Sequence, residues 1–172
     1  LPWNVVVGFE ENVEAVRWQE DQLIQETAEF MPWSVGFADE KAERLWSLLT
    51  EFQSLDSRRV TFKSNFRSSA TGQFVEAASR EGVTWSVQGH AGNGIAYGHA
   101  VAAAGPRDAG DSLARLRSLA VSLDGNLVLS RCPTEWKSRL PVWGEPRADA
   151  WLMQAIKQKL DPQNILNPGR FL

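Results

Sequence analysis

The sequence has a single cysteine, Cys132, and only two histidines, His90 and His99. One cysteine excludes an internal disulfide framework and a cysteine-rich metal site. Two histidines leave few side chains for proton transfer or metal binding near neutral pH. No apolar run approaches the length of a transmembrane helix and no secretory signal opens the chain, so a reducing cytoplasm is the expected compartment.

The chain also lacks a strong charge of one sign. Its 172 residues include 18 basic and 21 acidic side chains, which gives a net charge of −3. Such a balance offers no strong attraction for nucleic acid or an anionic membrane. The apolar content of 43% is ordinary for a globular protein, and the length predicts one domain with a real core, or one such domain with appendages. Because the first residue is Leu1 and not methionine, we expect the chain to be part of a longer protein.

The N-terminal part is predicted to be a strand followed by two helices. Residues 5–9 form an apolar run typical of a buried strand. Asn12 is placed to cap a helix that ends before Pro32. A second helix follows Asp39, with apolar residues at helical spacing at Ala42, Leu45, Trp46, Leu49 and Phe52.

The central part predicts the order strand, helix, strand, strand, helix, strand. The expected elements are a strand over 60–66, a helix from Ser68 or Ser69 to Gly82, strands over 83–90 and 95–103, a helix from Asp111 and a strand over 127–131. Pro106 and Gly110 are expected to keep the segment before Asp111 out of that helix. A last helix is expected to begin at Asp149 and to end at Asp161.

This order predicts an α+β fold with a ferredoxin-like antiparallel sheet (βαββαβ) and helices on one face of it. The first strand with its two helices, and the C-terminal helix, are additions to that unit.

A polar face is expected on the central hairpin. The dipeptide at 93–94, Asn-Gly, is the best short hairpin signal in the chain. A two-residue turn there pairs His90 with Tyr97 and Gln88 with His99, and any even loop length keeps these four side chains on one face. Such a face is costly to bury without partners, so it is exposed or faces a ligand or another domain. Two histidines without a nearby carboxylate do not favour a metal site, and a half-solvated face without a function is the alternative.

The C-terminal segment carries a family resemblance. Residues 157–171, with Asp161-Pro162 and then Asn167-Pro168-Gly169-Arg170, resemble the C-terminal signature of FAD-linked oxidases of the vanillyl-alcohol-oxidase type. His90-Ala91-Gly92-Asn93-Gly94 is similar to the His-Ala-Gly-Asp-Gly segment of members that act on 2-hydroxy acids. Residues 131–133 and 142–144 resemble segments of a glycolate-oxidising branch of that family.

The resemblance implies a function, and it implies that substrate binding and FAD binding belong to different domains. Residues 1–172 would be the substrate or cap domain, and FAD would be held mainly by an N-terminal domain that is absent from this chain. The implied reaction oxidises a glycolate-like 2-hydroxy acid to a 2-oxo acid by passing a hydride to the flavin, and this domain alone would be inactive. Sister flavin and iron–sulfur subunits, and through them a peripheral place at the inner membrane, are the further partners that the resemblance implies.

The predicted face and the resemblance together give the candidate site residues. His90 is the candidate catalytic residue, as a base or as a ligand. The candidates for substrate binding are Gln88, Asn93, Tyr97, His99 and Arg131, and those for the cofactor side are Asn167, Gly169 and Arg170. Tyr97 stands where the family has a second histidine and Asn93 where it has an aspartate, and these departures favour an altered or non-catalytic subunit.

Several alternatives stay open at this point. Arg131 and Arg67 are both able to clamp a carboxylate, but a solvated strand end is the alternative for each, and the preferred one for Arg67. Arg170 would form only a surface ion pair if the C-terminus merely docks. Cys132 is expected to be a buried, inert thiol. A ferredoxin-like module that binds a small ligand or dimerises, without catalysis, is the alternative function.

Overall fold

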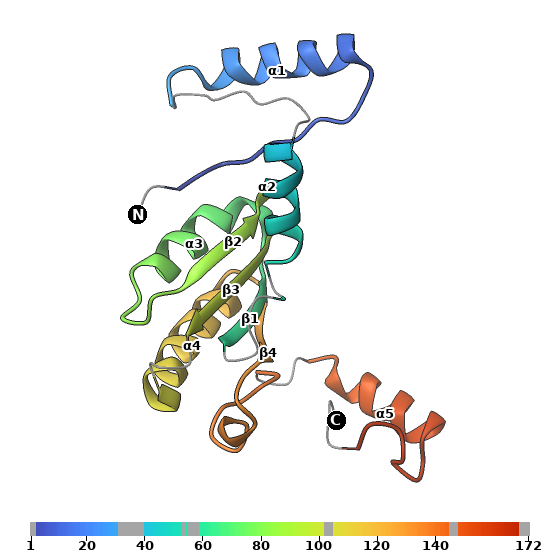
Figure 1. Ribbon diagram of the computed structural model, residues 1–172. Coiled ribbons are helices and arrows are strands. Elements are labelled where there is room, and N and C mark those ends of the chain that lie inside the picture. Colours follow the sequence, from blue (N-terminus) through green and yellow to red (C-terminus); the bar gives the residue numbers. More distant parts are fainter. Residues whose placement is uncertain are drawn as a thin grey trace. The chain divides into compact units, whose positions relative to one another are not determined.

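The computed structural model describes residues 3–30, 40–52, 54, 59–101, 105–144 and 148–168. The chain divides into two compact units, Leu1–Leu48 and Leu49–Leu172. Each unit is described by itself, and Figure 1 labels the elements of both.

The first unit is built from helices. Helix α1 spans Val13–Thr27, and helix α2, which begins in this unit, spans Glu40–Thr50. The predicted cap of α1 is confirmed, because the Asn12 side chain accepts the backbone N–H of Ala15 at 3.0 Å. Phe52, which was predicted to lie inside the second helix, follows its end in a turn.

The predicted strand over residues 5–9 is wrong. The described residues 3–12 contain no strand, and Val5, Val6 and Val7 are exposed. A strand needs a hydrogen-bonded neighbour, and the described part of this unit offers no other strand to pair with. The apolar run therefore has the composition of a strand, but no second strand in the described part of this unit hydrogen-bonds to it.

The second unit contains a four-stranded antiparallel sheet, so the predicted α+β class is confirmed. Its strands are β1 (Arg59–Asn65), β2 (Ser86–His90), β3 (Ile95–Val101) and β4 (Asn126–Arg131). They lie in the order β2-β3-β1-β4, and all neighbours are antiparallel.

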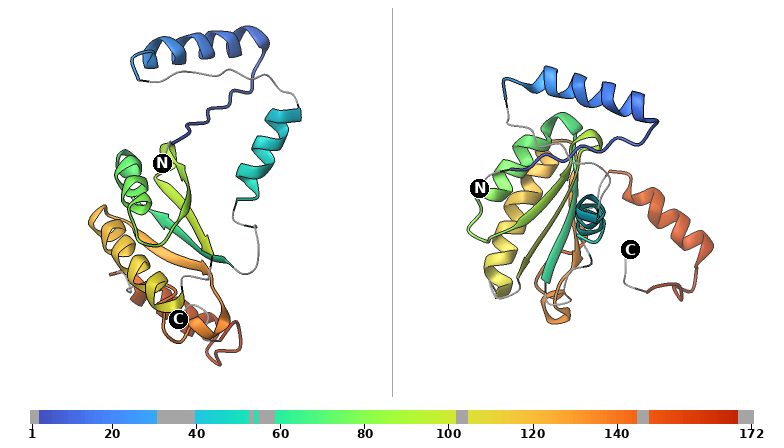
Figure 2. Two further views of the ribbon diagram at one scale, coloured as in Figure 1. Left: turned by 60° about the vertical axis from the view of Figure 1, so that its left-hand side comes forward. Right: turned by 45° about the horizontal axis from the view of Figure 1, so that its top comes forward.

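Two helices cover one face of this sheet (Figure 2). The 3₁₀ turn η1 (Ser68–Ala70) leads into α3 (Thr71–Ser79), and α4 (Gly105–Ser122) lies beside it. The core between sheet and helices includes Val60, Phe62, Phe74, Trp85, Leu113, Leu116, Leu127 and Leu129. The Phe62 ring occupies the place that a side chain at Gly98 would take, since a Cβ there would lie 2.3 Å from two ring atoms.

Helix α4 begins six residues before the predicted start at Asp111. Pro106 is tolerated because the first turn of a helix has backbone N–H groups without intrahelical acceptors, so the missing donor costs nothing there. Gly110 also lies inside the helix, where a Cβ would come within 2.8 Å of Leu140. Close packing against Leu140 thus outweighs the weak helix propensity of glycine.

Strand β2 is shorter than predicted, whereas β3 follows the predicted strand as far as the described residues extend. Strand β2 begins at Ser86, after the buried Val83 and Trp85, and β3 ends at Val101. Residues 102–104, which include the rest of the predicted strand, lie outside the described residues.

After β4 the chain forms the short 3₁₀ turn η4 (Thr134–Trp136) and then α5 (Ala150–Leu160). Asp149 occupies the N-cap position of α5, but its side chain makes no capping hydrogen bond, so the predicted capping role is not fulfilled. No helix in the described ranges is long and apolar enough to cross a membrane.

Candidate functional site

The hairpin between β2 and β3 has a four-residue connection. The 3₁₀ turn η2 (Ala91–Asn93) is followed by Gly94 at φ 62°, and His90 pairs with Ile95. The predicted two-residue turn is therefore wrong. The larger loop packs against β1, because Phe66 donates its N–H to the Gly94 carbonyl at 2.9 Å, and a Cβ at Gly94 would lie 2.1 Å from the Phe66 carbonyl oxygen.

The side chains of the hairpin nevertheless lie on the predicted faces of the sheet. Gln88 pairs with Tyr97, and Ser86 pairs with His99. Since side chains alternate along a strand, the four predicted residues share the face away from α3 and α4. We call this the polar sheet face, and its members on the four strands are Thr61, Lys63, Asn65, Ser86, Gln88, His90, Ile95, Tyr97, His99, Asn126, Val128 and Arg131.

Tyr97 lies at the centre of the open part of this face. The rings of His90 and Tyr97 meet edge to face, with centroids 5.5 Å apart and an interplanar angle of 84°. Lys63 pairs with Tyr97 across β1 and β3, and its Nζ lies 5.8 Å from the centre of the tyrosine ring. Gln88 is the direct cross-strand neighbour of Tyr97. An imidazole, a phenol, an amide and an ammonium group are thus brought together.

Sequence reasoning missed Lys63 as a member of the site. The signal was present, since Thr61, Lys63 and Asn65 alternate with the buried Val60, Phe62 and Ser64. What the alternation alone does not give is the pairing of β1 with β3, which brings Lys63 beside Tyr97.

His99 shares the polar sheet face but not its open part. It is 5% exposed, and the Phe52 ring packs on it with centroids 4.5 Å apart and an interplanar angle of 44°. The predicted partner of His99 was Gln88, but His99 pairs with Ser86. A residue covered in this way is poorly placed to meet a substrate, so the accessible group is made of Lys63, Gln88, His90 and Tyr97.

Arg67 and Arg131, the two candidates for holding a substrate carboxylate, differ in their surroundings. Arg67 forms an ion pair with Asp124, Nε to Oδ2 at 3.2 Å, in which both side chains are largely exposed, so the preferred interpretation of Arg67 as a surface residue is confirmed. Arg131 is exposed and pairs with Thr61 beside an irregularity in the β1–β4 ladder. Asn93 is exposed within η2.

The C-terminal motif is organised by a residue that the sequence indicated only as the end of the last helix and as part of the family signature. Asp161, at the end of α5, is buried. Its carboxylate accepts hydrogen bonds from the N–H groups of Ile165 and Leu166, both at 2.9 Å, and forms an ion pair with Lys157. The hydrogen bond from Lys157 chiefly, and those from the two backbone N–H groups, lower the pKa of the Asp161 carboxyl. Asn167 is exposed at φ 49°, while Gly169 and Arg170 lie outside the described residues.

Cys132 is half-buried against the core, and burial raises the pKa of its thiol. A raised thiol pKa disfavours the thiolate, which agrees with the prediction of an inert cysteine. No group of three or more potential metal ligands occurs among the histidine, cysteine, aspartate and glutamate residues that the structure describes.

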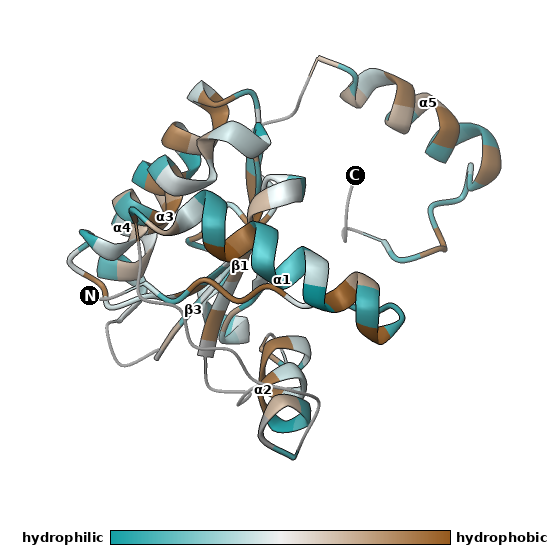
Figure 3. Ribbon diagram, turned by 90° about the horizontal axis from the view of Figure 1, so that it is seen from above, coloured by the Kyte–Doolittle hydropathy of each residue, from teal (hydrophilic) through white to brown (hydrophobic). Residues whose placement is uncertain are grey.

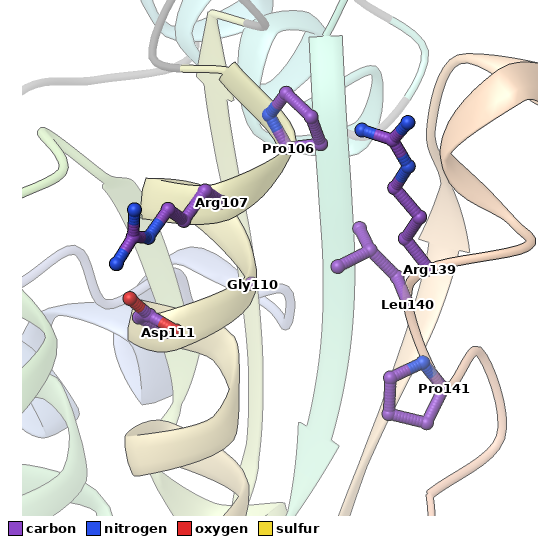
Figure 4. Close-up of a pocket in the computed structure, with 7 residues that line it drawn as sticks. All are labelled: Pro106, Arg107, Gly110, Asp111, Arg139, Leu140 and Pro141. Carbon is purple, nitrogen blue, oxygen red and sulfur yellow. The ribbon is translucent and has the colours of Figure 1, made fainter.

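A shallow pocket of about 290 Å³ lies at the start of α4. Its lining includes Arg107, Asp111 and Arg139 (Figure 4). The two guanidinium groups point to different sides of the pocket, and the Asp111 carboxylate lies near the guanidinium of Arg107. They do not converge on one anion, so we place the candidate site on the polar sheet face instead.

Comparison with known proteins gives a match to part of the chain. The family model for the C-terminal domain of FAD linked oxidases matches residues 145–171, which include α5 and the loop after it. No curated protein and no solved structure matches the chain. The similarity thus concerns the C-terminal segment, and it indicates a relation to flavin oxidoreductases without indicating a substrate.

Proposed function

We propose that the chain is the substrate-side, or cap, domain of a flavin-dependent oxidoreductase that oxidises a small 2-hydroxy acid to a 2-oxo acid. The observation that carries the proposal is the meeting of Lys63, His90 and Tyr97 on an accessible sheet face. The match of residues 145–171 to the C-terminal domain of FAD linked oxidases supports the flavin part of the proposal.

The chemistry of a 2-hydroxy acid fits these side chains. Its carboxylate needs a cation, and the Lys63 ammonium provides one beside the Tyr97 ring. Its hydroxyl proton needs an acceptor, and imidazole is the usual side chain for proton transfer near neutral pH. His90 takes this role, and Gln88 and Tyr97 add hydrogen-bonding groups that orient the substrate.

The residues described here do not fit the whole of FAD. Glycine-rich residues 89–94 lie at a strand-to-strand turn and not at the start of a helix, so they do not form the usual phosphate cradle. The pocket at α4, at about 290 Å³, is small for a dinucleotide. Another domain or polypeptide would therefore hold FAD, whose flavin, when bound, accepts the hydride from the substrate carbon that carries the hydroxyl.

The finer fold and partner assignments belong to the same proposal. The order βαββαβ within residues 59–131, with strands arranged β2-β3-β1-β4, supports a ferredoxin-like arrangement. Residues 131–133 and 142–144 resemble the FAD-binding component of bacterial glycolate oxidase, which acts beside sister flavin and iron–sulfur subunits. An accessory role, in which the site on this chain binds substrate more than it turns it over, is therefore the alternative to a catalytic one.

The test is to purify the product of the native gene and to record its visible spectrum. We expect a flavin band that is bleached by glycolate without oxygen. His90→Gln should retain the band and slow the bleaching by about 10²- to 10⁴-fold, the usual contribution of a general base. Glu76→Gln, an exposed change on α3, is the matched control. A colourless protein that forms a stable homodimer would contradict the proposal and favour the alternative of a binding or dimerisation module.

A further inference from the structure

The polar sheet face carries cations but no carboxylate. None of its members is an aspartate or a glutamate, although the chain has 21 acidic and only 18 basic residues. Its two cations are Lys63 and Arg131, and both side chains are exposed. None of the ion pairs among the described residues involves either of them. Two positive charges on a face without a negative partner favour an anionic ligand.

A bulge brings the second cation onto this face. Lys63 pairs with Val128, and Thr61, two residues earlier on β1, pairs with Arg131. Between these two pairs β4 has one residue more than β1, so Arg131 and not Ser130 stands opposite Thr61. Bulges of this kind redirect side chains and are frequent beside functional sites. Strict alternation along β4 would have left only one cation on the face.

Lys63 and Arg131 are diagonal neighbours on adjacent strands. Diagonal positions lie about 7–8 Å apart, which long side chains can bridge from both ends. The half-buried Val128 is the direct cross-strand neighbour of Lys63 and the member of the face that precedes Arg131 on β4. Two cations beside a small apolar surface match an acid whose two carboxylates are joined by methylene groups.

The face presents one reactive or charged group from each strand. In the order β2-β3-β1-β4 these groups are the His90 imidazole, the Tyr97 phenol, the Lys63 ammonium and the Arg131 guanidinium. Helices α3 and α4 lie on the other side of β1 and β3 (Figure 3), so they leave this row of groups uncovered. A ligand that lies along the row meets a proton acceptor first and two cations after it.

We propose that the substrate is a 2-hydroxy dicarboxylic acid, whose distal carboxylate is bound by Arg131. Lys63 then holds the carboxylate next to the hydroxyl group, and His90 accepts the hydroxyl proton. A guanidinium suits the distal position because its planar N–H groups can hold both carboxylate oxygens. This inference rests on the proposed function and narrows its substrate class. Glycolate remains a substrate, but it binds more weakly because it has no second carboxylate for Arg131.

The experiment measures the binding of 2-oxo acids, the products of the proposed reaction, to the product of the native gene by isothermal titration calorimetry. These ligands have no hydride to transfer, so binding is separated from turnover. Oxaloacetate is compared with 2-oxobutyrate and 2-oxoglutarate with 2-oxovalerate, pairs in which a methyl group replaces the distal carboxylate. We expect at least one diacid to bind about tenfold more tightly than its monoacid partner, as for one additional charge-assisted hydrogen bond. Added salt should reduce this preference, because exposed charges are screened.

Four variants assign the preference to its residue. Arg131→Gln should bind the diacid no better than the monoacid and should leave monoacid binding unchanged, whereas Arg131→Lys keeps a cation and should retain part of the preference. Lys63→Met should weaken the binding of both acids. Arg139→Gln removes an exposed arginine that lies outside the sheet, and it should change neither affinity.

The outcomes separate this inference from the proposed function. Equal affinities for diacids and monoacids, in a protein whose flavin band is bleached by glycolate, would overturn the inference and leave the proposed function standing. The same holds if the diacid preference survives in Arg131→Gln. A protein without a flavin band whose diacid preference is lost in Arg131→Gln would overturn the proposed function and leave the dicarboxylate site standing.

Discussion

Lys63 and Tyr97 face each other across neighbouring strands β1 and β3, with Lys63 Nζ 5.8 Å from the centre of the tyrosine ring. The ammonium is exposed and the His90 ring lies on the same tyrosine. A cation held over an aromatic ring keeps its charge available to a second, anionic partner. This arrangement makes Lys63 the residue whose removal tests the candidate site most directly.

We expect Lys63→Met to raise the KM for glycolate by roughly 10- to 100-fold, the effect of losing a charge-assisted hydrogen bond. Stability should hardly change, because Lys63 is exposed. Steady-state kinetics of the native gene product measure the effect. Lys137→Met is the matched control, since Lys137 is an exposed lysine outside the sheet. Equal KM values for the two variants would exclude Lys63 from substrate binding.

The contact between Gly98 and Phe62 predicts a stability effect. A methyl group at Gly98 would lie 2.3 Å from ring atoms of Phe62, which is fully buried, so the ring must move within a packed core. We expect Gly98→Ala to destabilise the protein by about 1–3 kcal/mol. Gly72→Ala in α3 has open space around it and should instead stabilise the protein by up to about 1 kcal/mol. Urea unfolding of both variants checks the opposite signs.

The polar sheet face could be predicted because it depends on strand alternation and little else. The predicted turn was two residues too short, yet Gln88, His90, Tyr97 and His99 share one face, since an even change in loop length preserves parity. The covering of His99 by Phe52 could not be predicted in this way. That contact joins residues 47 positions apart in the sequence, and no local pattern records it.

Two other features needed tertiary information. The apolar run at residues 5–9 has the composition of a strand, but pairing requires a neighbour that local sequence does not specify. The start of α4 at Gly105 depends on a proline that suits a first turn and on a glycine that accommodates Leu140. In both places the local sequence favours one secondary structure, and contacts with other parts of the chain decide which one forms.

A buried hydrogen bond in the core gives another stability test. The Trp85 indole donates to the Ser112 hydroxyl at 2.9 Å, and both residues are buried. Ser112→Ala leaves the indole N–H without this acceptor, which should cost about 1–3 kcal/mol. Ser118→Ala is the control on the same helix, because Ser118 bonds to the Ala114 carbonyl at an exposed position. Chemical denaturation should separate the two variants, and equal midpoints would contradict the role of this bond.

The C-terminal loop should respond to acid in a defined direction. Lys157 and two backbone N–H groups favour the ionised form of Asp161, so its pKa in the folded protein is below the ordinary value of 3.8. The carboxylate therefore stabilises the loop fully above about pH 4, and this contribution is lost as the pH falls through the lowered pKa. The amide resonances of Ile165 and Leu166, followed by NMR during a pH titration, should stay constant down to about pH 4 and shift together below it. Asp161→Asn removes the titrating group and should abolish the shared transition. Movement of both amides near neutral pH in the unmodified chain would show that another group controls the loop.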